Sequence, residues 1–371
     1  MKILELFGGL IRHGGEELFV LNCLRHLDAE DAAFDCLVVE DCQNDDFRRV
    51  IHEKGGRLTE LHTPLHATRF SNHVYRPVRD YFKTHRYDVV HIHASSIAAL
   101  ALLAAAADRA GTPKVIVHSH ATGKTDSLAH RLFRFLASLS ERRHVDVYCA
   151  CSKDAALWKF TPPYAEKAII IKNGVDCERF RFRPERRASL RRQLGVGAGA
   201  FVICHVGRLC AVKNQLFLLE VFEQVAARIP DAFLLLVGEG EDREKLEAAA
   251  VRKHLTERVL LTGVTDNVPD CLSAADVFAF PSEYEGFGIV ALEAQCAGLP
   301  VVASEGVPRE IRVTDDVCFL KAEHTEKAVL EWADKLCAYR GTARRDNSAA
   351  VAAAGYDIRS AAAQLKKLYG C

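Results

Sequence analysis

The sequence lacks an excess of charge of either sign, because lysine plus arginine total 49 and aspartate plus glutamate also total 49. Proteins that bind a nucleic-acid backbone usually carry a basic excess, so nucleic acid is not expected as a partner. Long apolar runs are lacking too. No stretch reaches the ~18–20 apolar residues that cross a bilayer, and the opening MKILELFGGL is too short for a secretory signal. We therefore expect a cytoplasmic protein whose contact with a membrane is at most peripheral.

Several patterns that indicate a metal or a cofactor are missing. There is no Cys-x-x-Cys pair, no Gly-x-Gly-x-x-Gly turn and no Asp-x-Asp pair. The 13 cysteines are odd in number and several lie in apolar runs, as Cys149, Cys151 and Cys204 do, which favours core thiols in a reducing compartment over disulfides. Side chains two residues apart on a strand point to the same face of the sheet. The pair His91 and His93 could therefore ligate a metal, and so could the pair His118 and His120. Because the other metal and cofactor patterns are missing, we expect neither metal nor cofactor, and we interpret His91 and His93 as structural.

Short apolar runs alternate with longer amphipathic segments along most of the chain. In the first half the strand candidates are residues 2–7, 34–40, 57–61, 89–93, 115–120, 147–150 and 169–172. Segments with helical spacing lie between them, for example 14–27, 70–84 and 97–110. Continuous apolar strands separated by helices are typical of parallel sheets buried on both faces. The pattern predicts a doubly wound, Rossmann-like α/β sheet.

An arginine-, proline- and glycine-rich break at residues 179–199 interrupts this alternation. It restarts with strand candidates at 202–206, 233–237, 259–261, 277–280 and 300–303. A chain of 371 residues is long enough for two domains. We predict an N-terminal domain over 1–175, a C-terminal domain over 176–355 and a last helix over 356–371 that packs back toward the N-terminal domain. Open α/β sheets bind ligands at the carboxyl ends of their strands, so a ligand cleft is expected between the two domains.

The stretch VFAFPSEYEGFGIVALEAQCAGLPVVA, residues 277–303, is the most informative. A strand ends at Pro281, a glycine turn at Gly286–Gly288 follows, and a helix then begins. A helix N-terminus preceded by glycines is a natural cradle for a diphosphate. Glu285 and Glu293 could contact different hydroxyls of one extended ligand, or they could be two solvated glutamates beside an ordinary turn.

Basic residues follow the first strand of the second half. Arg208 and Lys213 come directly after that strand, where a guanidinium can bind phosphate oxygens in pairs and an ammonium adds a point charge. The alternative is an exposed basic turn. Three glycines, Gly207, Gly238 and Gly263, end successive strands and would bring the backbone close to a nucleoside.

Taken in order, these motifs resemble glycosyltransferase family four, which has the GT-B fold of two Rossmann-like domains. The matching text is Gly-Arg-Leu…Lys-Asn, Val-Gly-Glu-Gly, Ala-Asp-Val-Phe…Pro-Ser…Glu-Gly-Phe-Gly…Glu-Ala and Gly-Leu-Pro-Val-Val-Ala-Ser. The resemblance implies that Glu285 contacts sugar hydroxyls and Glu293 the ribose. It also implies that Arg208 and Lys213 hold the diphosphate, beside the backbone of Gly286, Phe287, Gly288 and Ile289.

The same resemblance implies a metal-independent enzyme that transfers a hexose with retention from a nucleotide-diphosphate sugar, usually a UDP-sugar, to a glycan or lipid-linked acceptor. The segments GIVALEAQCAGLP and VASEGVPREI are most similar to bacterial exopolysaccharide and capsule transferases. Two other functions stay open: a sugar-nucleotide 2-epimerase of the same fold, and a non-catalytic nucleotide-binding subunit.

The first half matches the family less closely. The segment His13-Gly14-Gly15-Glu16-Glu17 is similar to the family's glycine-rich first loop but lacks its alanine, so Gly14 and Gly15 are weaker candidates for donor binding. His118-Ser-His120-Ala121 is similar to the His-Ser-His-Asn segment of the exopolysaccharide group. This resemblance makes His120 the candidate active-site histidine.

Two basic amphipathic stretches, residues 81–86 and 130–143, lie in the first half. Such helices can rest on an anionic leaflet of the inner membrane, but a solvated helix face is the more common interpretation.

Overall fold

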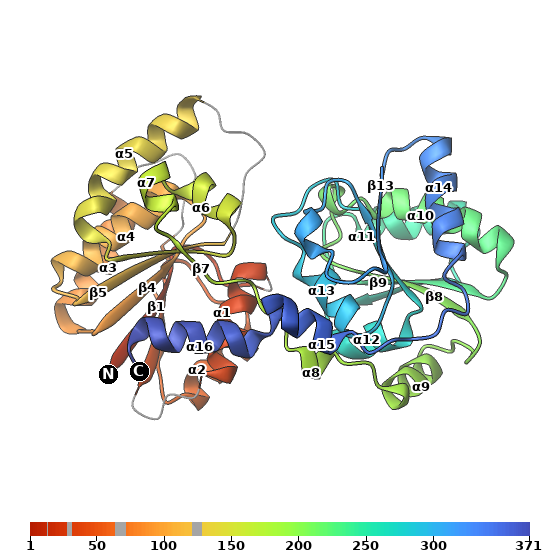
Figure 1. Ribbon diagram of the computed structural model, residues 1–371, viewed down its shortest axis with the longest axis horizontal. Coiled ribbons are helices and arrows are strands. Elements are labelled where there is room, and N and C mark those ends of the chain that lie inside the picture. Colours follow the sequence, from red (N-terminus) through yellow and green to blue (C-terminus); the bar gives the residue numbers. More distant parts are fainter. Residues whose placement is uncertain (13, 28–31, 64–71, 121–127) are drawn as a thin grey trace. The chain divides into compact units, whose positions relative to one another are not determined.

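The computed structural model describes residues 1–12, 14–27, 32–63, 72–120 and 128–371. The chain forms two compact units (Figure 1). Unit 1 comprises Met1–Gly174 together with Ile358–Cys371, and unit 2 comprises Val175–Asp357. Both chain ends therefore belong to unit 1.

Unit 1 is built on a seven-stranded sheet in the order β3-β2-β1-β4-β5-β6-β7, and every pair of neighbours is parallel. Its strands are β1 (Lys2–Phe7), β2 (Ala33–Val38), β3 (Leu58–Glu60), β4 (Val89–His93), β5 (Lys114–Ser119), β6 (Val147–Ala150) and β7 (Ile169–Ile170). Its helices are α1 (Gly15–His26), α2 (Asp45–Glu53), α3 (Asn72–Thr84), α4 (Ile97–Arg109), α5 (Leu128–His144), α6 (Lys153–Lys159), α7 (Pro162–Ala165) and α16 (Ile358–Tyr369).

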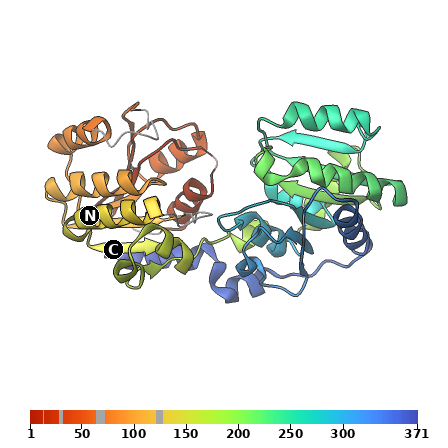
Figure 2. The ribbon, with the colours of Figure 1, turned by 90° about the horizontal axis from the view of Figure 1, so that it is seen from above.

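Helices cover both faces of this sheet (Figure 2). One core lies against α3, α4, α6 and α7, and the other lies against α1, α2 and α16. The last helix is held there by an apolar stripe at helical spacing, which consists of Ile358, Ala361, Ala362, Leu365 and Tyr369.

Unit 2 has a six-stranded parallel sheet in the order β10-β9-β8-β11-β12-β13. Its strands are β8 (Phe201–Val206), β9 (Ala232–Val237), β10 (Val259–Gly263), β11 (Val277–Phe280), β12 (Val301–Ser304) and β13 (Val317–Leu320). Its helical segments are α8 (Cys177–Phe180), α9 (Pro184–Gln193), η1 (Ala211–Lys213), α10 (Gln215–Arg228), α11 (Arg243–Arg252), α12 (Val268–Ala274), α13 (Ile289–Cys296), η2 (Arg309–Ile311), α14 (Glu326–Cys337), α15 (Ser348–Val351) and η3 (Ala352–Tyr356).

The fold-class prediction is confirmed: both units are doubly wound parallel sheets. One strand was missed. Strand β13 is an edge strand of only four residues, Val-Cys-Phe-Leu, and an apolar run this short does not by itself distinguish a strand from another buried segment. All 13 cysteines are free thiols, and ten of them are buried. Among the described residues, no helix is both long enough and apolar enough to cross a membrane.

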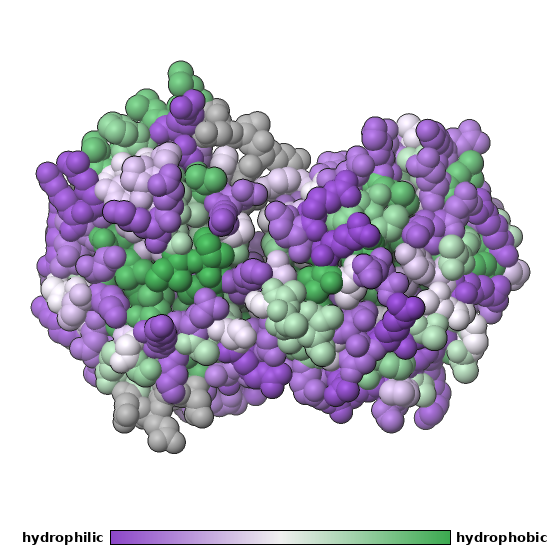
Figure 3. Space-filling model, viewed as in Figure 1, coloured by the Kyte–Doolittle hydropathy of each residue, from purple (hydrophilic) through white to green (hydrophobic). Residues whose placement is uncertain are grey.

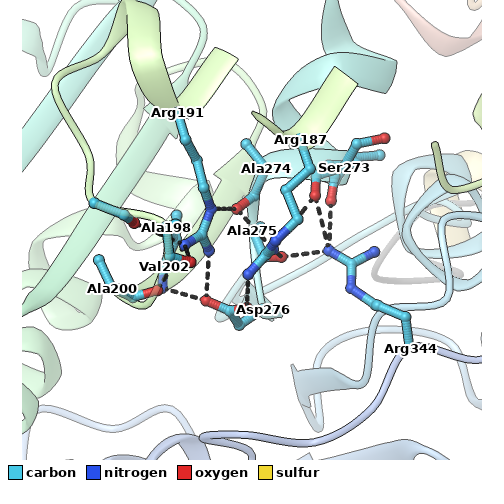
Figure 4. Close-up of polar contacts among 12 residues, drawn as sticks. Arg187, Arg191, Ala198, Ala200, Val202, Ser273, Ala274, Ala275, Asp276 and Arg344 are labelled. Carbon is cyan, nitrogen blue, oxygen red and sulfur yellow. Dashed lines mark hydrogen bonds and ion pairs between the residues drawn. The ribbon is translucent and has the colours of Figure 1, made fainter. Parts of the chain in front are cut away.

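A carboxylate shared by arginines ties α9 to the unit 2 sheet (Figure 4). Asp276 stands immediately before β11 and accepts from Arg187 at 2.6 Å and from Arg191 at 2.8 Å. It also accepts the main-chain N–H of Val202 at 2.7 Å. A third guanidinium, that of Arg344, bonds the main-chain oxygens of Leu272, Ser273, Ala275 and Ala297 nearby. Burial and the neighbouring arginines lower the pKa of Arg344 to about 9.

We expect Asp276→Ala to destabilise unit 2 by about 3 kcal/mol, because it leaves the buried guanidinium of Arg191 and the half-buried one of Arg187 without their counter-charge. Urea unfolding would measure the loss. Asp334→Ala is the matched control, since it removes the exposed partner of Arg228 and should cost about 0.5 kcal/mol or less. Equal losses in the two variants would contradict the role assigned to Asp276.

Candidate functional site

In each unit the strand order reverses beside the first strand, which is β1 in unit 1 and β8 in unit 2. Ligands of open α/β sheets bind at the carboxyl ends of the strands at such a reversal. In unit 2 the reversal lies between β8 and β11. The loop after β8 carries Arg208, and the loop after β11 carries Glu285 and Gly288, so both predicted donor loops leave the sheet at this point.

Arg208 is exposed, and its guanidinium has no partner among the described residues. Its main chain is held firmly, because Gln215 donates to the main-chain oxygen of Arg208 at 2.8 Å and to Nε2 of His205 at 3.2 Å. The other ring nitrogen of His205 donates to the oxygen of Ala279 on β11 at 2.9 Å. Neither His205 nor Gln215 was predicted from the sequence. A polar residue inside the apolar strand β8 was the available signal.

Three predicted glycines converge at this edge of the sheet. Gly207 donates to the oxygen of Val237 at 2.9 Å, and Gly238 donates to the oxygen of Gly263 at 3.0 Å. A Cβ on Gly238 would lie 2.1 Å from the oxygen of Gly207, and Gly238 has φ of 138°. Only glycine allows the backbones to approach this closely.

Lys213 and Glu285, predicted separately for phosphate and for sugar, form an ion pair in the structure. Their side chains are only 22% and 11% exposed, and the ammonium lies 5.6 Å from the centroid of the Phe280 ring. Main-chain bonds fix both loops, from Glu283 to Val212 at 2.8 Å and from Glu285 to Gly306 at 3.3 Å. The charge of Lys213 is thus offset by Glu285.

Helix α13 begins after a glycine in the left-handed conformation. Gly288 has φ of 91°, and a Cβ there would lie 2.7 Å from the Phe280 ring. No side chain caps the first turn, which starts at Ile289, and a Cβ on Gly286 would meet open space. The preceding Phe287 packs on Tyr356 with ring centroids 5.5 Å apart. The main-chain N–H groups of this turn are therefore placed to receive an anion.

Glu293 lies about one turn inside α13, because the helix starts at Ile289, directly after the glycine turn. Glu293 is half-buried, and burial raises the pKa of its carboxyl to about 7 although the charge of Arg179 opposes the rise. At neutral pH this carboxyl is poised between its protonated and ionised forms.

A pocket of about 180 Å³ lies beside the η1 turn. It is lined by residues that include Asn214, Gln215, Asp242, Lys245 and His324. None of the predicted donor residues contributes to its wall, so we do not assign the donor to this pocket.

In unit 1, α1 begins at Gly15 with Gly14 as its N-cap, and His13 lies outside the described residues. Glu16 follows in the first turn, and burial together with the charge of Glu17 raises its pKa to about 7. Lys159, which was not predicted from the sequence, is buried and donates to the main-chain oxygens of Ala94 at 3.1 Å and of Ser95. Burial lowers the pKa of Lys159 to about 8.

His120 comes directly after β5, and Ala121 lies outside the described residues. Nε2 of His120 lies 2.8 Å from Nδ1 of His93, so a residue interpreted as structural contacts the candidate active-site histidine. Nδ1 of His120 is buried and has no hydrogen-bond partner among the residues that the structure describes. Burial and the neighbouring histidines hold the pKa of His120 well below its usual range, so the ring is neutral at pH 7.

Two family models match the chain. The model described as Glycosyltransferase Family 4 matches residues 13–179, and the model described as Glycosyl transferases group 1 matches residues 186–345. Together they span most of both units.

Similar proteins agree with these matches. The chain is 30% identical to the Bacillus subtilis protein EpsF, which is named as a glycosyltransferase, over 84% of this chain and 80% of EpsF. It is 32% identical to an Escherichia coli protein named UDP-Gal:alpha-D-GlcNAc-diphosphoundecaprenol alpha-1,3-galactosyltransferase, over 60% of this chain and 59% of that protein.

Among solved structures, Anabaena HepE in complex with UDP has a TM-score of 0.77 to the chain at 22% identity, with all of both chains covered. That likeness concerns the fold. The two family models and the extended match to EpsF establish the family. The chain belongs to glycosyltransferase family four and is a glycosyltransferase of the GT-B fold.

Proposed function

We propose that this glycosyltransferase transfers a hexose, with retention, from a UDP-sugar to a glycan or lipid-linked acceptor in the synthesis of a bacterial polysaccharide. The observation that carries the proposal is the convergence of Arg208, the Lys213–Glu285 pair and the glycine-preceded start of α13 at the strand reversal of unit 2. Support comes from the Escherichia coli relative, whose name specifies a UDP-galactose donor and a lipid-linked acceptor, and from the UDP complex of HepE.

Donor binding would rearrange the charges at this edge. The diphosphate would take the ammonium of Lys213 from Glu285, and the freed carboxylate would accept hydroxyl hydrogens of the sugar. Arg208 could then bind the diphosphate without losing any protein contact, because its guanidinium has none among the described residues. Two cationic side chains and the N–H groups of α13 would stabilise the leaving group without a metal ion.

The bonds broken and formed in the transfer balance without a cofactor. The bond from the anomeric carbon to the β-phosphate oxygen breaks, and a bond from that carbon to the acceptor oxygen forms on the same face. The acceptor proton passes to the departing phosphate. His120, whose Nδ1 is unpaired within residues 1–12, 14–27, 32–63, 72–120 and 128–371, would contact a substrate hydroxyl, and Gly14 and Gly15 would lie beside the donor phosphates or the acceptor.

Donor screening tests the proposal most directly. Calorimetry with UDP, UDP-glucose, UDP-galactose and GDP-mannose should detect UDP-sugar binding, and release of UDP from the bound donor should require Arg208. Formation of a C2 epimer without any acceptor would instead identify the epimerase. Binding without turnover, together with full tolerance of alanine at Glu285, Glu293 and His120 in a complementation assay, would identify a non-catalytic subunit.

The affinity for UDP should rise with pH if Glu293 accepts the two ribose hydroxyls. A carboxyl with a pKa of about 7 is roughly 10% ionised at pH 6 and roughly 90% ionised at pH 8. Because the ionised form is the better acceptor, Kd should fall about fivefold to tenfold over this range. In Glu293→Gln the dependence should shrink to that of UDP itself, and an unchanged slope would contradict the ribose assignment.

Helix α5 suits a lipid-linked acceptor. Its apolar side chains Leu132, Phe135, Leu136 and Leu139 recur at helical spacing, yet between 39% and 58% of each is exposed. Arg131, Arg142 and Arg143 are exposed on the same helix, and apolar surface gathers over α5 in unit 1 (Figure 3). An exposed apolar stripe flanked by arginines is complementary to an anionic bilayer surface, so we propose peripheral binding to the cytoplasmic membrane face through α5.

Vesicle sedimentation would test this membrane contact. The protein should bind vesicles that contain phosphatidylglycerol, and Phe135→Ser with Leu136→Ser should weaken binding about tenfold or more. Val251→Ser is the control, because Val251 is equally exposed, at 59%, but belongs to unit 2. Equal binding by the two altered proteins, or no binding by the native one, would contradict the assignment.

A further inference from the structure

A chain of buried polar groups runs beneath the candidate active-site histidine in unit 1. It begins at Glu5 on β1, a residue that is 1% exposed in the centre of the sheet. Oε2 of Glu5 lies 2.8 Å from Nε2 of His93 on β4, and Nδ1 of His93 lies 2.8 Å from Nε2 of His120. Glu5, His93 and His120 thus form one continuous line of hydrogen bonds.

A second arm leaves the other oxygen of Glu5. The hydroxyl of Tyr369 on α16 donates to Oε1 of Glu5 at 2.7 Å and lies 2.7 Å from Nδ1 of His91. Nε2 of His91 is in turn 3.2 Å from Nδ1 of His118. This arm contains no atom of His120 and ends on a different imidazole.

The donors and acceptors of the first arm follow from the charge of Glu5. Burial alone would raise the pKa of Glu5, but the charge of His91 and the bonds from His91 and His93 outweigh it, so the pKa lies well below its usual range. An ionised carboxylate only accepts, and Nε2 of His93 must therefore carry the proton. Burial lowers the pKa of His93 to about 4, so His93 is neutral and its Nδ1 is an acceptor.

The same reasoning continues to His120. Because Nδ1 of His93 accepts, Nε2 of His120 must donate, and a neutral His120 then has no proton on Nδ1. Ring contacts hold this orientation. His120 stacks on His118 with centroids 4.1 Å apart, and Phe19 lies 5.4 Å away. The outcome is a buried Nδ1 lone pair that has no partner in the described part of the chain and calls for a hydrogen-bond donor.

We propose that Glu5 and His93 are positioning residues that hold neutral His120 in its Nε2-protonated tautomer, so that Nδ1 accepts a hydrogen bond from a substrate hydroxyl. This inference rests on the proposed function, because it takes His120 as a residue that contacts substrate. It specifies the polarity of that contact: His120 accepts from the substrate, and a substrate analogue without a hydroxyl at that point leaves the lone pair unpaired.

A metal ion is the alternative for the same histidines. One ring nitrogen from each of His91, His93 and His118 lies within 4.8 Å of the others. However, the two ring nitrogens of His91 already lie within hydrogen-bond distance of Tyr369 and His118. Those of His93 lie within hydrogen-bond distance of Glu5 and His120. We call the hydrogen bonds from Glu5 through His93 to His120 the relay. A metal bound to these rings would have to break bonds of the relay, so stoichiometric metal in the purified protein, bound through these rings, would overturn the proposal.

Glu5→Gln tests the relay, since the side-chain amide can donate to Nε2 of His93 and reverse every proton along the arm. Long-range proton–nitrogen spectra of histidine-labelled protein should show His120 protonated on Nε2 in the native enzyme and shifted toward Nδ1 protonation in Glu5→Gln. The resonance is assigned by its loss in His120→Asn. With UDP-glucose as the probe donor, kcat for UDP release should fall at least about tenfold, with KM changed less than about threefold.

Tyr369→Phe is the matched control. It removes a buried hydrogen bond from the same carboxylate and should lower Tm about as much as Glu5→Gln does. It leaves the His93–His120 arm intact, so the tautomer of His120 and kcat should stay near native values. If Glu5→Gln does not fold, His93→Phe keeps a ring beside Phe7 and removes the acceptor of His120, with the same expected change in tautomer and kcat.

The outcomes separate the relay from the proposed function. Full activity in His120→Asn would remove His120 from the transfer reaction, whatever its tautomer. An inactive His120→Asn together with a Glu5→Gln that has native kcat, or with native His120 protonated on Nδ1, would overturn the relay alone. Equal losses of kcat in Glu5→Gln and Tyr369→Phe would show a merely structural network and overturn the relay as well.

Discussion

Arg208→Ala is expected to lower kcat about a hundredfold or more and to leave the stability of the protein unchanged. A preorganised donor that faces the charge of a leaving diphosphate contributes about 3 kcal/mol in the transition state. The guanidinium of Arg208 is exposed and has no partner among the described residues, so its removal breaks no contact of the fold. Steady-state release of UDP from the donor identified by calorimetry would measure the loss, and thermal unfolding would verify the unchanged Tm.

The control for Arg208 is Arg252→Ala, which removes an equally exposed arginine from the end of α11 and should leave both kcat and Tm native. Arg208→Lys should recover only part of the activity, because an ammonium cannot bind two phosphate oxygens side by side as a guanidinium does. Native kinetics in Arg208→Ala would remove Arg208 from the diphosphate site.

Glu285→Ala is expected to reduce transfer about as strongly as Arg208→Ala does, and to leave the binding of UDP unchanged or slightly tighter. Loss of the carboxylate should lower kcat about a hundredfold and weaken the discrimination between UDP-glucose and UDP-galactose, because the sugar loses its hydrogen-bond acceptor. UDP itself should bind as tightly as before or up to about threefold more tightly. The reason is that the ion pair with Glu285 no longer competes for the ammonium of Lys213.

Glu293→Ala is the matched comparison within the same loop and helix. It should raise the Kd for UDP about tenfold and leave kcat at saturating donor within a fewfold of the native value, since it removes a contact to the nucleoside rather than to the reacting sugar. Kinetic titrations of both variants against one donor would separate the two glutamates. Equal effects of the two substitutions on Kd and kcat would contradict the division of roles.

The elements of the fold were largely predictable because parallel strands buried on both faces give continuous apolar runs. Strands β1, β8 and β11 could be located within a residue or two from that signal alone. The four-residue edge strand β13 was not predicted, because an apolar run this short does not identify a strand by itself. The start of α13 was predictable as well, because the glycine turn 286–288 precedes the helix, and φ of 91° at Gly288 keeps that residue outside it.

The candidate site was predictable as a set of residues and not as a set of contacts. The resemblance to the family selected Arg208, Lys213, Glu285 and Glu293 by their place in motifs. It could not predict that Lys213 and Glu285 neutralise each other, since they are 72 residues apart in the chain and meet only because β8 and β11 are neighbours. Likewise the aspartate of Ala-Asp-Val-Phe belongs to a motif, but only the packing of α9 makes Asp276 the counter-charge of two arginines.

The sequence by itself determined the class of fold, the family and the identity of the residues that bear charge at the ends of strands, because these depend on local apolar spacing and on short motifs. The tertiary structure decided which polar groups share a proton or a charge. Glu5, His93, His120 and Tyr369 are spread over 364 residues and become one network only where β1, β4, β5 and α16 meet. Such contacts arise from the order of strands in a sheet and from how a helix docks on it, and no local pattern encodes that geometry.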